Sequence, residues 1–298
     1  MSRLFRTNEL LKEKILEWYP NPGTYSTSIP GFIIARRDAP SDFERYFYKP
    51  MVILILQGSK EAILGSEEYR YSENQYMVST VDLPATSRII EASHEKPCLA
   101  VALEFDSLII IQLLSEISEN EDEKEKSEFR SFDIGNTDIL LVDAFLRLTL
   151  LLEKSCNKPK VLSDMIKREI HYLLLDSSIG YQLKTLATQG TQYNKIAKAI
   201  NILQQNYKRK LNMETLAAKI KMATSSFYKD FKKITTLSPI QYQKQLRLFE
   251  AQRLMRFEGF NAQAASFEVG YESATQFSRE YKKLFGTPPK ISLKKFAA

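Results

Sequence analysis

The chain has 298 residues, of which 44% are hydrophobic, enough for about two domains with buried cores. Its net charge of +6 is divided unevenly, because residues 191–298 carry 20 Lys/Arg and 7 Asp/Glu, a net of +13, whereas the remainder carries −7. Charges run through the first 18 residues and interrupt the most apolar run (139–153), and only two Cys and two His occur, so we expect a cytoplasmic protein without membrane span, disulfide framework or His-rich metal site.

Short β-rich runs follow an opening amphipathic helix and fill the first 105 residues. They are separated by Gly, Pro, Asn and Ser, and they read GFIIARR, MVILILQ, EAILG, EYRY, QYMVS, SRIIEAS and CLAVALEF. Many short strands at such spacing predict a small barrel or jelly roll. A barrel of this kind holds one small molecule or none.

Three polar residues are candidates for the barrel interior and for a ligand there: Arg36, Tyr48 and Gln57. Arg36 would favour a carboxylate or a phosphate, because its guanidinium fork matches two oxygens. Alternation along GFIIARRD turns either Arg36 or Arg37 outward, and the sequence leaves that choice open.

Nothing in the sequence indicates catalysis, a metal or a cofactor. Metal sites of barrel enzymes need two or three His with a carboxylate, and the chain has only His94, at an expected strand end, and His171, in an expected helix. The sequence also has no Gly-rich phosphate loop and no nucleophile elbow. We therefore predict no catalytic residues.

Three helical stretches are predicted between the strands and the basic region: residues 106–118, 137–153 and 159–176, with a charged, solvated loop at 119–128. The third stretch has a wide apolar face, which implies a partner helix from the same subunit or from a second one. This face consists of Leu162, Met165, Ile166, Ile170, Leu173 and Leu174. The polar stretch 183–194 then reads as a linker.

The basic region repeats itself at an offset of 50 residues. FYKDFKKITTLSP (227–239) aligns with FSREYKKLFGTPP (277–289), so that Phe227 meets Phe277 and Lys229 meets Arg279. A small-residue helix and a short turn precede each copy. This is the plan of a helix-turn-helix unit, whose second helix enters the major groove of DNA.

Burial of the aromatic stripe in each copy turns the opposite helix face toward solvent. The residues expected to read bases there are Ser225, Tyr228 and Lys229 in the first copy, and Thr275, Ser278 and Arg279 in the second. One turn further on, phosphate contacts are expected from Lys232, Lys233, Lys282 and Lys283. Solvated charge is the alternative for these lysines.

One helix without an internal breaker is predicted between the copies, over residues 238–255. Eighteen residues at about 1.5 Å each form a rod of roughly 27 Å. A rod of this order can hold two reading heads about one turn of DNA apart, roughly 34 Å.

The basic region resembles the DNA-binding domain of the AraC/XylS family of bacterial transcription regulators. VGYESATQFSREYKKLFGTPP is similar to the defining motif of that family, and the resemblance extends over residues 195–296. Four positions depart from the family pattern. Thr236 stands where the first copy usually has Gly, Ala223 where Ser is common, and Ala265-Ser266 where an Ile-Ala pair is usual. The missing Gly is expected to strain the turn after the first recognition helix.

Residues 29–106 resemble the cupin-like N-terminal domain of one AraC-type subgroup. The implied fold is α+β and multidomain: a cupin-like β-barrel with helices over 1–182 for sensing and dimerisation, a linker over 183–194, and an all-α double helix-turn-helix domain over 195–298. The resemblance implies a regulator that binds double-stranded promoter DNA as a homodimer, responds to a small-molecule effector and, as an activator, contacts RNA polymerase. A nonspecific nucleoid protein and a barrel enzyme or carrier are the alternatives.

Overall fold

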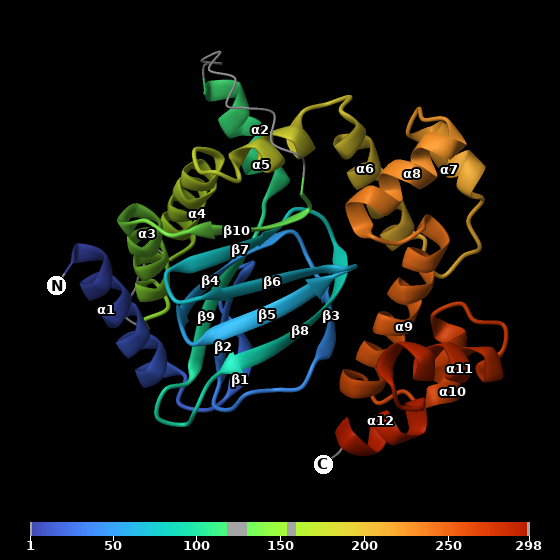
Figure 1. The fold of residues 1–298 in the computed structure, drawn as a ribbon, viewed down its shortest axis with the longest axis horizontal. Coiled ribbons are helices and arrows are strands. Elements are labelled where there is room, and N and C mark those ends of the chain that lie inside the picture. Colours follow the sequence, from blue (N-terminus) through green and yellow to red (C-terminus); the bar gives the residue numbers. More distant parts are fainter. Residues whose placement is uncertain (1, 118–129, 154–158, 297–298) are drawn as a thin grey trace. The chain divides into compact units, whose positions relative to one another are not determined.

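The computed structural model describes residues 2–117, 130–153 and 159–296 (Figure 1). Packing divides the chain into unit 1, residues 1–189, and unit 2, residues 190–298, and each is described by itself. The predicted charged loop 119–128 lies outside the described residues.

Unit 1 contains two antiparallel sheets. The six-stranded sheet has the order β1-β2-β9-β4-β7-β10, and the four-stranded sheet has the order β3-β8-β5-β6. The strands are β1 (Gly23–Ser26), β2 (Phe32–Arg37), β3 (Glu44–Tyr48), β4 (Met51–Gln57), β5 (Ser59–Leu64), β6 (Glu67–Ser72), β7 (Gln75–Ser79), β8 (Leu83–Glu91), β9 (Cys98–Glu104) and β10 (Phe132–Asn136).

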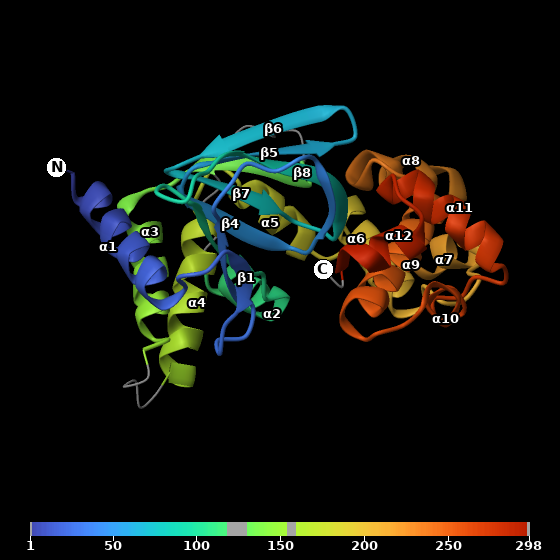
Figure 2. The same ribbon diagram turned by 90° about the horizontal axis from the view of Figure 1, so that it is seen from below.

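Helices cover the outer face of the six-stranded sheet, so unit 1 has three layers (Figure 2). They are α1 (Arg3–Trp18), α2 (Ser107–Glu116), α3 (Ile139–Leu150), α4 (Pro159–Leu175) and α5 (Gly180–Ala187). Side chains of Ser2, Asp106 and Asp138 accept hydrogen bonds from the first-turn amides of α1, α2 and α3 and thereby begin these helices.

The central strands β4 and β9 are buried on both faces. Along β4, Val52 and Leu54 pack against the helices, whereas Met51 and Ile53 face the space between the two sheets. Because both faces are covered, the sequences MVILIL and CLAVAL are apolar without interruption. The core of unit 1 therefore has two parts, separated by the six-stranded sheet.

Seven strands predicted from sequence correspond to β2 and β4–β9. The strands β1, β3 and β10 were not predicted, and neither was α5. The predicted linker, 183–194, begins inside α5, where Leu183 is only 2% exposed and belongs to the core of unit 1. This start of the linker was therefore wrong, because burial of Leu183 stabilises a helix in a segment that is polar in composition.

The described residues of unit 2 form helices joined by turns and loops. Its helices are α6 (Gln192–Gln205), α7 (Met213–Lys219), α8 (Thr224–Thr235), α9 (Pro239–Phe257), α10 (Ala262–Glu268), α11 (Ala274–Phe285) and α12 (Pro289–Phe296). The long helix α9 confirms the predicted rod, and a capping box formed by Ser238 and Gln241 begins it, with Pro239 in its first turn.

The described helices include none that combines the length and the apolar character needed to cross a membrane. Among the described residues, no three His, Cys, Asp or Glu side chains gather as ligands for a metal ion. His171 is buried, and it bonds through Nδ1 to the carbonyl of Lys167 (2.6 Å) and through Nε2 to the amide of Asp106 (2.9 Å). This histidine lies in α4, in keeping with the helix expected there, and its ring is packed in the interior.

Candidate functional site

Helices α7 and α8 form the first helix-turn-helix unit. The side chain of Asn212 caps α7, and the turn after it passes through Lys221, whose φ is 57°. Helix α8 buries Phe227 and Phe231, which stack edge to face with ring centroids 5.5 Å apart. Ala223 stands at the N-cap of α8 and offers no side-chain hydrogen bond.

Helices α10 and α11 form the second unit on the same plan. Asn261 caps α10, Ser273 caps α11, and the intervening turn contains Gly270 with a φ of 88°. The ring of Phe277 contacts that of Tyr281, with centroids 5.5 Å apart, and both rings are fully buried. Both recognition helices, α8 and α11, thus turn one aromatic face inward.

The predicted DNA-contacting side chains lie on the opposite faces of α8 and α11. The exposed ones are Ser225, Lys229, Lys232 and Lys233 on α8, and Thr275, Arg279, Lys282 and Lys283 on α11, whereas Tyr228 and Ser278 are half-buried. Lys229, Arg279 and Lys282 form no ion pair with any residue that the structure describes. These three positive charges therefore remain available to an anionic partner.

Glu280 fixes α11 against α9. Its carboxylate accepts hydrogen bonds from the hydroxyl of Tyr271 (2.8 Å), from Lys244 of α9 (2.9 Å) and from Gln276 (3.1 Å). Burial acts to raise the pKa of Glu280, but these three hydrogen bonds outweigh it, and the pKa lies below its ordinary value. The ionised carboxylate of Glu280 therefore holds α11 against α9 and fixes the direction in which the exposed face of α11 points.

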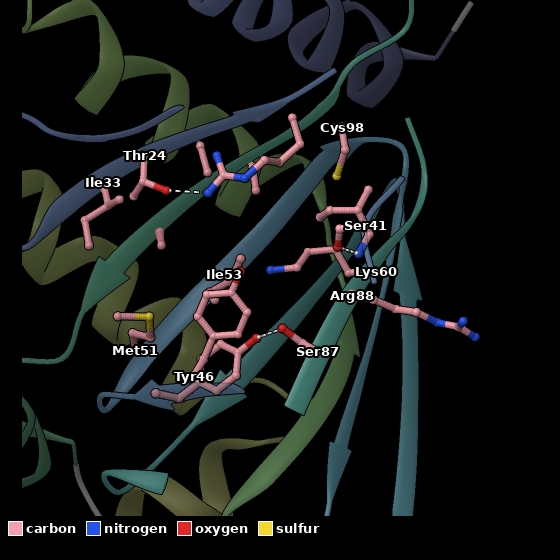
Figure 3. Close-up of a pocket in the computed structure, with 16 residues that line it drawn as sticks. Thr24, Ile33, Ser41, Tyr46, Met51, Ile53, Lys60, Ser87, Arg88 and Cys98 are labelled. Carbon is pink, nitrogen blue, oxygen red and sulfur yellow. Dashed lines mark hydrogen bonds between the residues drawn. The ribbon is translucent and has the colours of Figure 1, made fainter. Parts of the chain in front are cut away.

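A second candidate site is a cavity of about 180 Å³ between the two sheets of unit 1 (Figure 3). Most of its wall is apolar, and it includes Ile33, Met51 and Ile53. The polar and charged residues at its wall are Thr24, Arg37, Ser41, Tyr46, Tyr48, Lys60, Ser87 and Arg88. A mostly apolar wall with a few polar groups is the usual composition of a small-molecule site.

Lys60 gives the cavity its positive charge. Its side chain extends into the cavity, whereas that of Arg88 points away from it (Figure 3). The Lys60 ammonium makes no hydrogen bond or ion pair with any described residue, while Arg37 is held by the carbonyl of Gly23 (2.6 Å) and the hydroxyl of Thr24 (2.7 Å). An unpaired ammonium in a largely apolar cavity favours an anionic guest.

The thiol of Cys98 lies within the electrostatic influence of both Lys60 and Arg37. Burial raises the pKa of Cys98, and the nearby charges of Lys60 and Arg37 act in the opposite direction. Both cations therefore act on the same end of the cavity, where β9 begins.

The three residues predicted for the barrel interior have different outcomes. Tyr48 lines the cavity, and its hydroxyl donates to Oγ of Ser87 over 3.0 Å. Gln57 lies outside the lining, at a register shift between β4 and β9, where its amide donates to the carbonyl of Pro97 (2.8 Å). This position for Gln57 corrects the prediction, since the bulge and the local bond remove its side chain from the lumen.

Arg36 was also predicted wrongly, because Arg37 is the residue that faces the cavity. Along β2, Phe32, Ile34 and Arg36 face the helices, and the guanidinium of Arg36 is fixed by Asp38 over 2.8 and 3.1 Å. Packing of the apolar side chains against α1 and α3 determines this register.

Lys60 was missed by sequence reasoning, although a signal exists. Lys60 lies on the same face of β5 as Ala62 and Leu64, and both of those residues are buried. A lysine on the apolar side of an alternating strand is the pattern that would have identified it.

Two family models match the chain. The model described as AraC-type transcriptional regulator N-terminus matches residues 28–182, and a helix-turn-helix domain model matches residues 216–294. The first match alone covers more than half of the chain.

Curated relatives match about a third of the chain. The HTH-type transcriptional activator RhaS of Pectobacterium carotovorum is 24% identical over 103 residues, which are 35% of this chain and 37% of RhaS. The Msm operon regulatory protein of Streptococcus mutans is 31% identical over 88 residues, 30% of this chain and 32% of that protein. The chain thus spans about a third of the length of these relatives.

Solved structures of ToxT from Vibrio cholerae share the fold over most of the chain. An apo variant aligns with a TM-score of 0.62 and 11% identity, covering 90% of this chain and 99% of ToxT. The wild-type protein with bound unsaturated fatty acid aligns equally, with a TM-score of 0.62 and 11% identity over 90% of this chain and 97% of that one.

Proposed function

The chain belongs to the AraC-type family of transcriptional regulators, and from this we propose that it binds specific promoter DNA through both helix-turn-helix units under the control of a small acidic molecule. The observation that supports this most directly is the duplicated face. Two helices of the same unit each bury aromatic rings on one side and present hydroxyls and cations on the other. Exposed cations of this kind bind phosphates and release counterions.

Base contacts would come from the N-terminal halves of the two recognition helices. We assign them to Ser225, Tyr228 and Lys229 of α8 and to Thr275, Ser278 and Arg279 of α11. Contacts to phosphate would come from Lys232, Lys233, Lys282 and Lys283, one turn further along. Because the two sets differ, one chain would read two unlike boxes about 10 base pairs apart.

The effector would be an amphiphilic carboxylate bound in the cavity of unit 1. Lys60 provides the charge, Tyr46 and Tyr48 provide hydroxyls, and aliphatic side chains provide the apolar wall. That ToxT, which has the same fold, has been solved with an unsaturated fatty acid bound is in keeping with such a molecule.

A second copy of the chain is the proposed protein partner, in the cytoplasm, with RNA polymerase as a further partner of an activator. Exposed apolar residues on α4 support the dimer, since Val161, Met165 and Tyr172 recur at helical spacing and are between 46% and 64% exposed. Met165 belongs to the apolar face that the sequence indicated for this helix, and Val161 and Tyr172 extend it.

Footprinting on DNA selected from a random pool tests the function. A sequence-specific regulator protects one discrete site, and its affinity falls steeply as salt rises, because several phosphates are neutralised. Uniform protection along the DNA would identify a nonspecific nucleoid protein. A salt slope near zero, with no protection, would leave a barrel enzyme or carrier as the better description.

A further inference from the structure

Arg247 lies near the middle of α9, the helix that runs from the first helix-turn-helix unit to the second (Figure 1). Before it, Tyr242 packs edge to face on Phe231 of α8, with ring centroids 5.3 Å apart. After it, Leu254 and Met255 belong to the hydrophobic core of the second unit. Each unit therefore has a core of its own, and Arg247 lies between the two cores.

The guanidinium of Arg247 donates hydrogen bonds to backbone carbonyls from both units. Nε donates to Tyr207 (2.7 Å), and one terminal nitrogen donates to Lys208 (3.2 Å) and Arg209 (3.1 Å), in the segment that connects α6 to the first helix-turn-helix unit. The other terminal nitrogen donates to Gly270 (2.9 Å), in the turn of the second unit. One side chain thus joins two segments that are about sixty residues apart in sequence.

The same two segments touch each other directly. Lys208 forms an ion pair with Glu268. A Cβ on Gly270 would stand 2.0 Å from the carbonyl oxygen of Lys208, so the two backbones approach as closely as only a glycine permits. Because this contact has little tolerance, small shifts of either unit would break it.

An arginine is the side chain that this junction requires. Its guanidinium is planar and presents five N–H donors in a fixed fork, whereas a lysine ammonium is a single point of charge. Burial lowers the pKa of Arg247, but the group remains charged, and its hydrogen bonds to the carbonyls are therefore charge-assisted. Gln243, one turn earlier on α9, adds bonds to Tyr207 (3.1 Å) and Arg209 (2.6 Å) on the first-unit side alone.

We propose that Arg247 is the positioning residue that fixes the orientation of α8 relative to α11, and with it the spacing of the two DNA boxes that one chain accepts. The proposal rests on the two-headed DNA binding proposed above. Helix α9 spans the distance between the two helix-turn-helix units, and the bonds that Arg247 makes to each side limit rotation about its ends.

The first experiment measures the orientation without DNA. Spin labels are placed on the full chain at Ser226 of α8 and Gln263 of α10, two exposed positions outside the proposed DNA contacts, after both native cysteines are replaced by alanine. Arg247→Gln and Arg247→Lys should each broaden the distance distribution at least about twofold, because neither side chain can bond both segments. Arg247→Lys keeps the charge and decides the matter where the glutamine variant does not fold.

The matched control is Arg253→Gln. Arg253 lies on the same helix, but among the residues that the structure describes it pairs only with Glu250 and Glu258, at the same end of α9. This variant removes one positive charge without disconnecting the units, and its distance distribution should equal that of the unmodified sequence. Unchanged distributions in both Arg247 variants would overturn the proposal.

The second experiment uses two-box DNA selected by the unmodified chain, with and without five base pairs inserted between the boxes. The unmodified chain should lose about 100-fold in affinity on insertion, because the second head can no longer engage. Arg247→Lys should bind the uninserted site about tenfold more weakly and lose less than about tenfold on insertion, since its heads move independently.

The two experiments separate the inference from the proposed function. Should the unmodified chain tolerate the insertion, two-headed binding is wrong, and the spin-label distances still judge the structural role of Arg247. An insertion penalty in Arg247→Lys equal to that of the unmodified chain would refute Arg247 as the positioning residue while leaving two-headed binding intact.

Discussion

Thr236 and Gly286 occupy equivalent positions in the two repeats, each ending a recognition helix in the left-handed region with φ of 62° and 76°. Glycine adopts this conformation without cost, whereas a β-branched residue does not. The opposite ends of the same helices differ as well, since Ser273 caps α11 and Ala223 leaves α8 uncapped. The first recognition helix is therefore the less stabilised of the two at both ends.

Replacement of Thr236 by Gly should stabilise unit 2 by about 1 kcal/mol. Glycine relieves the strain of the left-handed conformation, and the greater conformational freedom of the unfolded chain offsets part of that gain. Hydrogen exchange of the α8 amides measures the effect. Gly286→Ala is the matched control and should destabilise α11, because no atom lies within 4 Å of the added methyl and the strained φ is its only cost. No protection gained in Thr236→Gly would show that the turn is unstrained.

An N-cap should have a similar effect at the start of α8. Ala223→Ser should raise the stability of the first helix-turn-helix unit by about 1 kcal/mol, since a serine oxygen can accept a hydrogen bond from an amide of the first turn of α8. Ser273→Ala should lower the stability of the second helix-turn-helix unit by a similar amount, because the Ser273 side chain accepts a hydrogen bond from the amide of Gln276. Denaturant unfolding of each variant checks this, and equal stabilities for the Ala223→Ser and unmodified chains would contradict it.

Arg279 and Lys282 should differ in what they contribute to DNA binding. Arg279→Ala should cost about 1–3 kcal/mol and relax the base preference at one position, whereas Lys282→Ala should weaken binding to all sequences alike and reduce the salt slope by about one. Competition binding on a panel of single-base variants separates the two patterns. Uniform losses for both variants would remove Arg279 from base reading.

Lys60 should decide whether acidic molecules stabilise unit 1. A series of straight-chain carboxylates, each with its primary amide as the neutral match, is screened by thermal unfolding, and a carboxylate present at about 100 times its Kd should stabilise by about 2.7 kcal/mol. Lys60→Met should abolish this effect. Lys49→Met, which removes an exposed lysine paired with Glu104, should not. Equal stabilisation by amide and carboxylate would show that the cavity does not select charge.

Unit 1 should lose stability as the pH falls from about 7 to 5, in part through His171. Burial lowers the pKa of His171 against the opposing effects of the Lys167 carbonyl and the Asp106 carboxylate. The unfolded chain therefore binds a proton near pH 6.5, where the folded chain does not, and folding weakens as the pH falls below that value. The bond from the Asp106 amide to Nε2 likewise requires the neutral ring.

His171→Gln should flatten that pH dependence, because its amide can keep one acceptor and one donor without titrating. The exposed His94→Gln serves as the matched control, because it removes a histidine that pairs with the Asp38 carboxylate at 3.3 Å and leaves the buried His171 in place. A slope that persists in His171→Gln would assign the acid sensitivity to other groups.

Sequence patterns were sufficient for the elements that bury apolar residues at a regular period. The strand MVILILQ and the helix ending in Phe257 were predicted closely, and the 50-residue repeat was enough to locate both recognition helices. The strands ERYFY and FDIGN were missed, because few of their side chains are buried and their pairing partners, not their own composition, make them strands.

The cavity could be predicted only in part. Alternation states that Arg36 and Arg37 point in opposite directions, but the packing of α1 and α3 decides which direction is inward. Gln57 left the lumen because of a register shift that depends on the partner strand. Both errors concern tertiary choices that no local pattern contains.

Strand β4 separates the cavity from the helical layer by the thickness of a single strand. Ile53 touches whatever occupies the cavity, and the next residue, Leu54, touches the helical layer. Since both side chains hang from the same stretch of backbone, any guest that displaces Ile53 also moves Leu54 against the helices. The position of β4 therefore depends both on what fills the cavity and on how the helices pack against the other face of the strand.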